Sequence, residues 1–419
     1  MSCLAPPPPV PAAPAHPLRR LLLDLGDALL GGGLPVHEVE EELRGLGAAL
    51  GAPGVRVAAL TNGLFVALHA DEPTSFRPVD SALRFEQTAE VLQLVHRLRA
   101  GGLDGEQGLA ELDRIRRAPA RWPTWVGELG ALPVGVGLCL FLQPVAVNVL
   151  VAGVGSLIVV GLTALARRLP LLRPLLPVTA GFAVALLVLS LARAGVLEGP
   201  LRTIVATLAI LLPGGLLVTG LSEIAAGAAS AGTARLVSGA VQLALFLTGV
   251  AAAATATGMP ASALENVQVA KPGWWVVCLG LALAVVGLVV YVHTPPRAIP
   301  WIGAVIVVTV AAQVVVGSVS GAAVGGLAGA VTAAVAATVV NRLPGGPLWQ
   351  VLYLPAFWIV VPGSFGLLNT AQIEAGHGSQ PVLAAVSAVF GVSIGTLIGS
   401  VISRVPGSSV RSAQAARAA

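Results

Sequence analysis

Long apolar runs fill the chain from residue 126 onward. Each of ten such runs is close to the ~20 residues that an α-helix needs to cross the hydrocarbon core of a bilayer. They lie at about 126–142, 145–166, 175–194, 201–221, 233–257, 273–292, 299–317, 320–340, 349–370 and 381–403. The pattern predicts a polytopic α-helical membrane protein with about ten transmembrane helices.

Residues 18–118 carry a different pattern, in which apolar and polar positions alternate as they do in small α+β domains. Helical spacing extends over 18–50, with an interruption at Gly31-Gly32-Gly33, and two more helices are predicted at about 82–100 and 105–117. We therefore expect a cytoplasmic α+β domain to precede the membrane spans.

Three short strands complete this predicted domain. Runs of β-prone residues at 55–59 and 64–69 are joined by Asn62-Gly63, a dipeptide typical of hairpin turns, and a third strand is predicted at 75–79. The proline-rich residues 1–17 and the C-terminal residues 405–419 are predicted to be disordered tails.

Composition agrees with a membrane protein and excludes several functions. Mean hydropathy is +0.87, and 56% of the residues are hydrophobic whereas only 11% are charged. HExxH, GxGD and Walker motifs do not occur, so neither an intramembrane protease nor an ATP-driven pump is indicated, and we expect no enzyme activity, catalytic residues, metal or cofactor. The net charge of +4 comes from arginines between spans, which does not favour a nucleic-acid partner.

These arginines predict the orientation. If the N-terminal domain is cytoplasmic, the segments on that side hold Arg114, Arg116, Arg117, Arg121, Arg167, Arg168, Arg173, Arg235, Arg297, Arg342, Arg404 and Arg411. The basic residues of the opposite loops are only Arg193, Arg202 and Lys271. Because cytoplasmic loops are enriched in lysine and arginine, both termini are predicted to be cytoplasmic.

One signature occurs twice inside the apolar runs: Ile210-Leu-Leu-Pro213-Gly214 and Ile359-Val-Val-Pro362-Gly363. Proline followed by glycine breaks a helix, and matching breaks in two halves of a membrane protein point to a transporter's substrate site. The offset, 362 − 213 = 149 residues, predicts two five-helix repeats, 126–257 and 273–404. Because five is odd, the second repeat must be inverted relative to the first.

Polar side chains beyond the breaks are candidates for substrate binding. Thr219 and Asn369 follow the two prolines by six and seven residues and could hydrogen-bond a substrate. Packing between helices is an equally good interpretation of Asn369.

Few charged residues in this region could couple transport to a gradient. Glu223 and Glu374 follow the breaks, and each could carry a proton or cap its span at the level of the lipid headgroups. Arg235 could pair with Glu223, hold a substrate carboxylate or anchor its span. Glu128 and His293 lie beside spans or at loop edges, where we expect contact with water.

The residues around the first break resemble the threonine/serine exporter family. The stretch PGGLLVTGLSEIAAGAASAGTARL (213–236) has that family's Pro-Gly break, acidic residue, small-residue run and Gly-x-x-Arg step. LGDALLGGGLPVHEVEEELRGLGAALG (25–51) resembles its opening helices, with Val39-Glu40. The resemblance covers about 18–404 and implies a cytoplasmic domain joined to ten spans.

One position departs from the family. After the first span the family tends to have a glycine pair and then an aspartate, where this chain has Leu142-Gln143-Pro144 and Asn148. An amide then stands in place of an acid, which makes Asn148 a candidate substrate residue.

We therefore expect a secondary exporter of small polar amino acids in the bacterial cytoplasmic (inner) membrane, driven by the proton gradient or the membrane potential. Its partners would be a small-molecule substrate and the lipid bilayer, and the sequence does not decide whether the chain forms a homo-oligomer. The first alternative is a dicarboxylate (succinate-like) exporter, because some relatives export dicarboxylates as two separate chains. The second is a membrane-anchored regulatory or hydrolytic protein that acts through its N-terminal domain.

Overall fold

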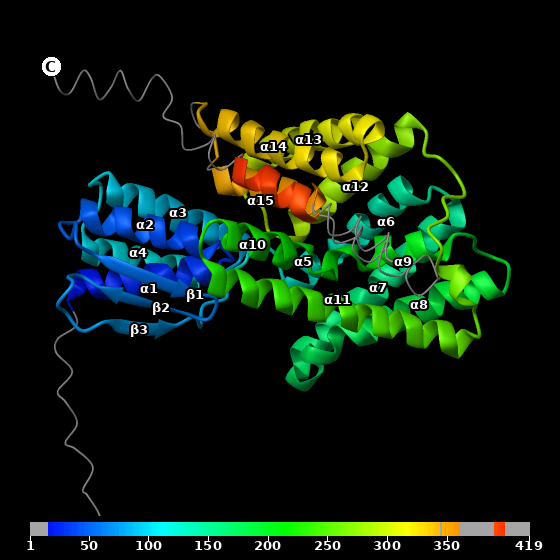
Figure 1. The fold of residues 1–419 in the computed structure, drawn as a ribbon, viewed down its shortest axis with the longest axis horizontal. Helices are drawn as coiled ribbons and strands as arrows, with labels where there is room; N and C mark the ends of the chain where they lie inside the picture. The colour runs from blue at the N-terminus through cyan, green and yellow to red at the C-terminus, as the bar shows by residue number, and fades with distance from the viewer. Residues whose placement is uncertain (1–15, 344–345, 348, 361–388, 399–419) are drawn as a thin grey trace, which may run out of the picture. The chain divides into compact units, whose positions relative to one another are not determined.

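The computed structural model describes residues 16–343, 346–347, 349–360 and 389–398. Most of these residues are helical, and the strands form one small sheet. The chain divides into two compact units (Figure 1). Residues 1–83 with 90–118 form the first, and residues 84–89 with 119–419 form the second.

In the first unit, helices α1 (Pro17–Gly31) and α2 (Val36–Ala49) pack against a three-stranded antiparallel sheet. The strands, in spatial order, are β1 (Arg56–Leu60), β2 (Gly63–Ala67) and β3 (Ser75–Pro78). Helices α3 (Phe85–Arg99), whose residues 85–89 belong to the second unit, and α4 (Gly105–Arg117) follow. The helices and strands predicted for this region are thus confirmed.

Local sequence signals explain where these elements begin and end. Leu60 pairs with Gly63 in the sheet, so the predicted hairpin turns at Thr61-Asn62. Helix α4 starts at a capping box, in which Asp104 and Gln107 satisfy each other's backbone amides. Hydrogen bonds from Arg114 and Arg97 lower the pKa of Glu111 to about 2, so this link between α3 and α4 stays ionised at neutral pH.

The second unit holds the apolar helices. Seven are long and apolar enough to cross a membrane, counting only the described residues. They are Thr124–Leu142 (α5, Thr124–Leu129, and α6, Ala131–Leu142), α7 (Ala146–Arg168), Pro170–Arg193 (with α8, Leu176–Arg193), α11 (Ala229–Thr257), α12 (Trp274–Tyr291), Pro296–Ser320 (with α13, Ile299–Ser320) and Val324–Asn341 of α14 (Ala322–Asn341).

Two further helices, Pro200–Leu211 (with α9, Pro200–Leu208) and α10 (Gly214–Ala225), are bent by 63° at a break and together are long and apolar enough to count as an eighth span. The first eight predicted spans thus have helical counterparts, with one of them broken. The ninth and tenth correspond to α15 (Trp349–Val360) and the shorter helix Val389–Ile398, and the rest of both lies outside the described residues. The count of ten stays a prediction.

Apolar side chains on the outside of this unit match a lipid environment. On α7, Leu150, Val154 and Leu157 share one face at helical spacing and are about half exposed or more. Placing such a face among lipid tails costs no free energy, whereas exposing it to water is unfavourable. The exposed face therefore supports a membrane location for these helices.

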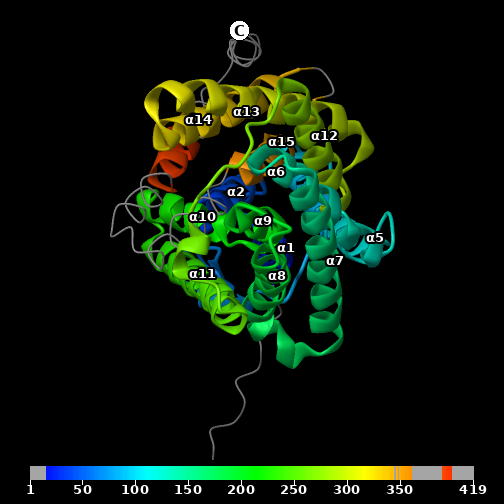
Figure 2. The same ribbon diagram turned by 90° about the vertical axis from the view of Figure 1, so that its right-hand side faces the viewer.

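Inside the unit, buried side chains form two main clusters. The first-half cluster comes from α7, α8, α9 and α11 and contains Val184, Ile204 and Phe246. The second-half cluster comes mainly from α12 to α15 and contains Ile302, Ala333 and Leu352. Helix α9 lies centrally, against α6, α7 and α8 (Figure 2).

Helix α6, with Gly130 just before it, and helix α12 join the two halves through four glycines. A Cβ atom added at Gly137 would lie 2.4 Å from the Gly280 oxygen, and one added at Gly280 would lie 2.7 Å from the Gly137 oxygen. The same holds for Gly130 and Gly287, at 2.5 Å in both directions. Only glycine lets the two backbones approach this closely.

Candidate functional site

The predicted break in the fourth span is confirmed. Helical structure ends at Leu211, Leu212 is extended with ψ 140°, and α10 starts at Gly214. Pro213 has no N–H group, and its ring disfavours a helical conformation at Leu212, so the span cannot continue straight. The second predicted break, Pro362-Gly363, lies outside the described residues, as do Asn369 and Glu374.

A polar side chain from another helix satisfies one of the carbonyl groups that the break frees. Gln242 of α11 donates from Nε2 to the Leu211 oxygen at 3.1 Å. Unpaired carbonyls are costly in lipid, so this bond stabilises the bent form. Our sequence interpretation missed Gln242, although a lone glutamine inside the apolar run 233–257 was a visible signal.

The break lies where the two clusters meet. Leu208, just before it, is part of the first-half cluster, and Val218, just after it, is part of the second-half cluster. Ile210 packs against both. In addition, Ser393 Oγ of the last described helix lies 3.4 Å from the Val218 oxygen. A change in the bend at Pro213 would therefore move one cluster relative to the other.

A buried ion pair lies near the C-terminal end of α10. Glu223 Oε2 lies 3.1 Å from Arg235 Nε, the Glu223 side chain is fully buried, and that of Arg235 is 14% exposed. The structure thus brings together the two residues that the sequence suggested as partners. Removing one partner of a buried pair leaves an uncompensated charge, so this contact is energetically demanding.

Two glycines make this ion pair possible. Helices α10 and α11 cross at Gly220 and Gly232, where an added Cβ would lie 2.7 Å and 2.4 Å from the other glycine's oxygen. The close crossing brings Arg235, three residues beyond Gly232, against α10. Thr219 precedes Glu223 by one helical turn, on the same face of α10, and is partly buried.

Asn148 belongs to a second polar group, at the opposite end of the broken span. Its Nδ2 donates to the Glu198 oxygen and to Thr203 Oγ1, both at 2.8 Å. Gln143 joins it, because its Nε2 donates to the same backbone oxygen of Glu198 at 3.3 Å, and its Oε1 accepts from Val269 N at 3.1 Å. Asn148 is fully buried, and its Oδ1 has no hydrogen-bond partner within the described parts of the chain. One buried acceptor is therefore available for a ligand.

Two residues expected to contact water are packed instead. His293 is only 7% exposed, because a left-handed backbone (φ 57°) places its ring against Trp122 with ring centroids 5.7 Å apart. Glu128 forms an ion pair with Arg167 at 2.5 Å, and its side chain is 12% exposed. Both expectations were wrong, because a loop fold and a neighbouring helix cover these residues.

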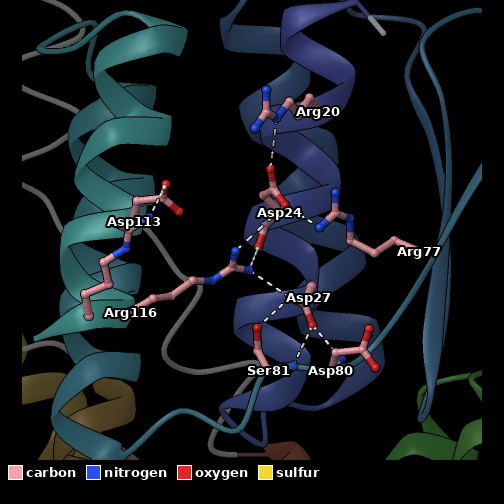
Figure 3. A network of polar contacts seen from close by, with 9 residues as sticks. Arg20, Asp24, Asp27, Arg77, Asp80, Ser81, Asp113 and Arg116 are labelled. Carbon is pink, nitrogen blue, oxygen red and sulfur yellow. Dashed lines mark hydrogen bonds and ion pairs between the residues drawn. The ribbon is translucent and has the colours of Figure 1, made fainter.

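In the first unit, a polar network surrounds two aspartates of α1 (Figure 3). Asp24 faces Arg77 at 2.5 Å, Arg20 at 3.7 Å and Arg116 at 3.8 Å. Asp24 and Asp27 of α1 are both buried in the first unit. The arginines compensate their charges, which could not be buried without partners. Such a network is explained by folding and does not require catalysis.

Replacing Asp27 with asparagine should destabilise the first unit by about 2 kcal/mol. Asp27 accepts hydrogen bonds from the amides of Asp80 and Ser81, from Ser81 Oγ and from Arg116. The side-chain NH₂ group of asparagine would face some of these N–H and O–H donors, so those hydrogen bonds could not form. Thermal unfolding of the full chain in detergent, with hydrogen exchange localising the change to α1 and residues 80–82, measures it.

The matched control is Asp113→Asn. Asp113 pairs with Arg117 at 3.8 Å on the exposed side of α4, and such surface pairs contribute well under about 1 kcal/mol. Equal effects of the two substitutions would contradict a stabilising role of the Asp27 network.

Several apolar helices, with one of them broken between two clusters, define this chain as a multi-pass membrane protein of the transporter class. The model of the family described as "Putative threonine/serine exporter" matches residues 20–257. The chain belongs to this threonine/serine exporter family. The match spans the first unit and the helices through α11, a shorter range than the resemblance at 18–404. Comparisons with curated proteins and with solved structures found no match.

Proposed function

We propose that this protein is a secondary exporter of small polar amino acids of the threonine/serine class. The observation that carries the proposal is the broken span, whose two helices belong to different clusters. Transporters bind their substrates at such breaks between halves, where backbone groups are free to interact. Membership in the exporter family supports the same direction and substrate class.

An amino acid offers complementary groups to this site. The first amides of α10, at Gly214 and Gly215, lack helical partners and lie at the positive end of the helix dipole, so they favour a carboxylate. Thr219 can receive the ammonium or hydroxyl group. Asn148 Oδ1, beside Thr203 at the other end of the broken span, would contact the substrate at a different stage of its passage. Pro213, Pro362, Gly363 and Asn369 complete the proposed substrate site.

The Glu223–Arg235 pair is our candidate for coupling. A buried carboxylate can take up a proton when its partner cation moves away, and here the two residues lie on different helices, α10 and α11. Glu374 is the proposed counterpart in the second half. The driving force would be the proton gradient or the membrane potential.

The glycine contacts between α6 and α12 support the inverted repeat. Gly130 and Gly137 precede Gly280 and Gly287 by 150 residues each (280 − 130 and 287 − 137), close to the 149-residue offset of the breaks. Gly130 touches Gly287, and Gly137 touches Gly280. A two-fold axis between the helices would exchange these two contacts. We therefore propose repeats at 126–257 and 273–404, preceded by a cytoplasmic domain at 18–118.

The proposal places the chain in the bacterial cytoplasmic (inner) membrane with both termini inside. Cysteine labelling tests this orientation: Arg167→Cys and Arg173→Cys should react only with reagents that enter the cytoplasm, and Lys271→Cys should react from outside. The opposite result would contradict the topology.

Transport by the purified chain in proteoliposomes tests the function. Unlabelled threonine or serine outside should accelerate the exchange of labelled threonine, whereas succinate should not. Exchange with succinate alone would favour the dicarboxylate alternative. No exchange of either, together with an activity retained by residues 1–118 alone, would favour the alternative that the N-terminal domain is the active part.

Replacing Gly214 with leucine should abolish this exchange while the protein still folds and inserts. Gly214 is buried at the break, where a large side chain would fill the space beside the free amides. The matched control is Gly303→Leu on α13, where an added Cβ meets nothing within 4 Å. Normal exchange by Gly214→Leu would place the substrate site elsewhere.

A further inference from the structure

A pocket with a cavity volume of about 400 Å³ lies between α5 and α7, away from the break at Pro213. Its rim is polar and its inner wall is apolar. The rim consists of Trp125, Glu128, Arg167 and Arg168, and the wall of Leu129, Val160 and Ala164. No role proposed above for substrate or coupling involves these residues.

The charge of the rim favours an anion. Glu128 and Arg167 neutralise each other through their 2.5 Å ion pair. Arg168 makes no ion pair within the part of the chain that the structure describes, so the rim carries a net charge of one positive unit. A zwitterionic ligand also carries a cationic group, and the one carboxylate among the lining residues, Glu128, is already paired with Arg167.

The shape of the pocket follows the polarity profile of a phospholipid. Ala164 and Val160 precede Arg168 by four and eight residues, so the apolar wall extends about 6 to 12 Å along α7 from the charged rim. Trp125 is 61% exposed at the rim, as is typical of tryptophan at the level of the headgroups.

The segment after α7 points to the same environment. Leu171, in the turn Pro170–Leu175, is 89% exposed, and Leu169 and Leu175 are about half exposed. Leucines so exposed next to Arg167, Arg168 and Arg173 are stable where a chain lies at the boundary between headgroups and acyl chains.

We propose that this pocket binds an anionic phospholipid, with the phosphate at Arg168 and the start of an acyl chain along Leu129, Val160 and Ala164. Basic pockets between transmembrane helices on the cytoplasmic side are suited to such headgroups. The site is separate from the proposed substrate site, so its failure would leave the exporter proposal intact.

Fluorescence quenching by brominated lipid tests the proposal on the full chain in nanodiscs. Brominated phosphatidylglycerol in phosphatidylcholine should quench the fluorescence component that Trp125→Phe removes, and brominated phosphatidylcholine should quench it less. Arg168→Gln should weaken the phosphatidylglycerol-specific quenching about fivefold, which corresponds to ~1 kcal/mol for one basic residue near an anionic surface.

Two further variants separate the pocket from the general surface. Arg173→Gln removes the same charge outside the pocket lining and should leave the quenching unchanged. Ala164→Phe fills the apolar wall without changing charge and should weaken it. Size-exclusion profiles establish that each variant is folded before it is compared.

Three results would overturn the proposal. Equal quenching by the two brominated lipids would show no preference for an anionic headgroup. An equal loss in Arg173→Gln would indicate general surface charge. Competition by inorganic phosphate, with no effect of Ala164→Phe, would make the pocket a site for a free anion.

Discussion

Glu223→Gln should abolish transport driven by an imposed pH gradient while gradient-free exchange of labelled threonine persists. Glu223 is fully buried and 3.1 Å from Arg235. Glutamine cannot release a proton, so the gradient would no longer act on the transport cycle. Measuring both fluxes in proteoliposomes separates coupling from substrate binding.

Stability must be separated from coupling in this experiment. Glutamine leaves Arg235 without its counter-charge, and breaking a buried pair costs about 3–5 kcal/mol. The double variant Glu223→Gln/Arg235→Gln removes both charges and should recover much of that stability without recovering gradient-driven flux. Glu198→Gln, at an exposed carboxylate, is the control that should transport normally. Gradient-driven flux at the wild-type rate in Glu223→Gln would show that another group carries the proton.

Gly280→Leu should prevent stable assembly of the two halves, with a loss of at least about 3 kcal/mol. Overpacking of a buried contact usually costs about 1–3 kcal/mol. At Gly280 even a Cβ would lie 2.7 Å from a backbone oxygen of α6, and backbone cannot move aside as a side chain can. The temperature at which the size-exclusion peak of the detergent-solubilised protein is lost measures the effect.

Gly161→Leu is the matched control for this substitution. Gly161 lies on α7, where an added Cβ meets nothing within 4 Å, so leucine should be tolerated there. The unfolding temperature of Gly137→Ala should lie between those of Gly280→Leu and Gly161→Leu, because a single methyl group already meets the Gly280 oxygen at 2.4 Å. Unfolding of Gly280→Leu at the wild-type temperature would contradict the close packing of α6 and α12.

Much of the first unit followed from its sequence. The helical repeat broken at Gly31-Gly32-Gly33 and the hairpin signal Asn62-Gly63 correspond to α1, α2 and the β1–β2 turn. In a water-soluble domain the alternation of apolar and polar residues reports which face of each element is buried, so the pattern carries tertiary information. The arginine network around Asp24 and Asp27 was not foreseen, because its partners come from three distant segments.

The candidate site was predicted in part. Pro213-Gly214 marked the break, and Glu223 with Arg235 were two of only a few charges in the apolar region, so their pairing was a short step. Gln242 escaped notice because its role depends on the Leu211 oxygen, 31 residues away. Glu128 and His293 were misplaced because position along the chain does not reveal which neighbour covers a residue.

The sequence by itself determined that the chain enters the membrane, how long its apolar helices are and where one of them breaks, because bilayer thickness and the chemistry of proline act on local stretches. Only the tertiary structure decided that α9 and α10 belong to different clusters and that α6 meets α12 at four glycines. The reason is that lipid tails are as apolar as the protein interior. Hydrophobicity therefore does not distinguish a lipid-facing side chain from a packed one, and close contacts depend on small residues far apart in the chain.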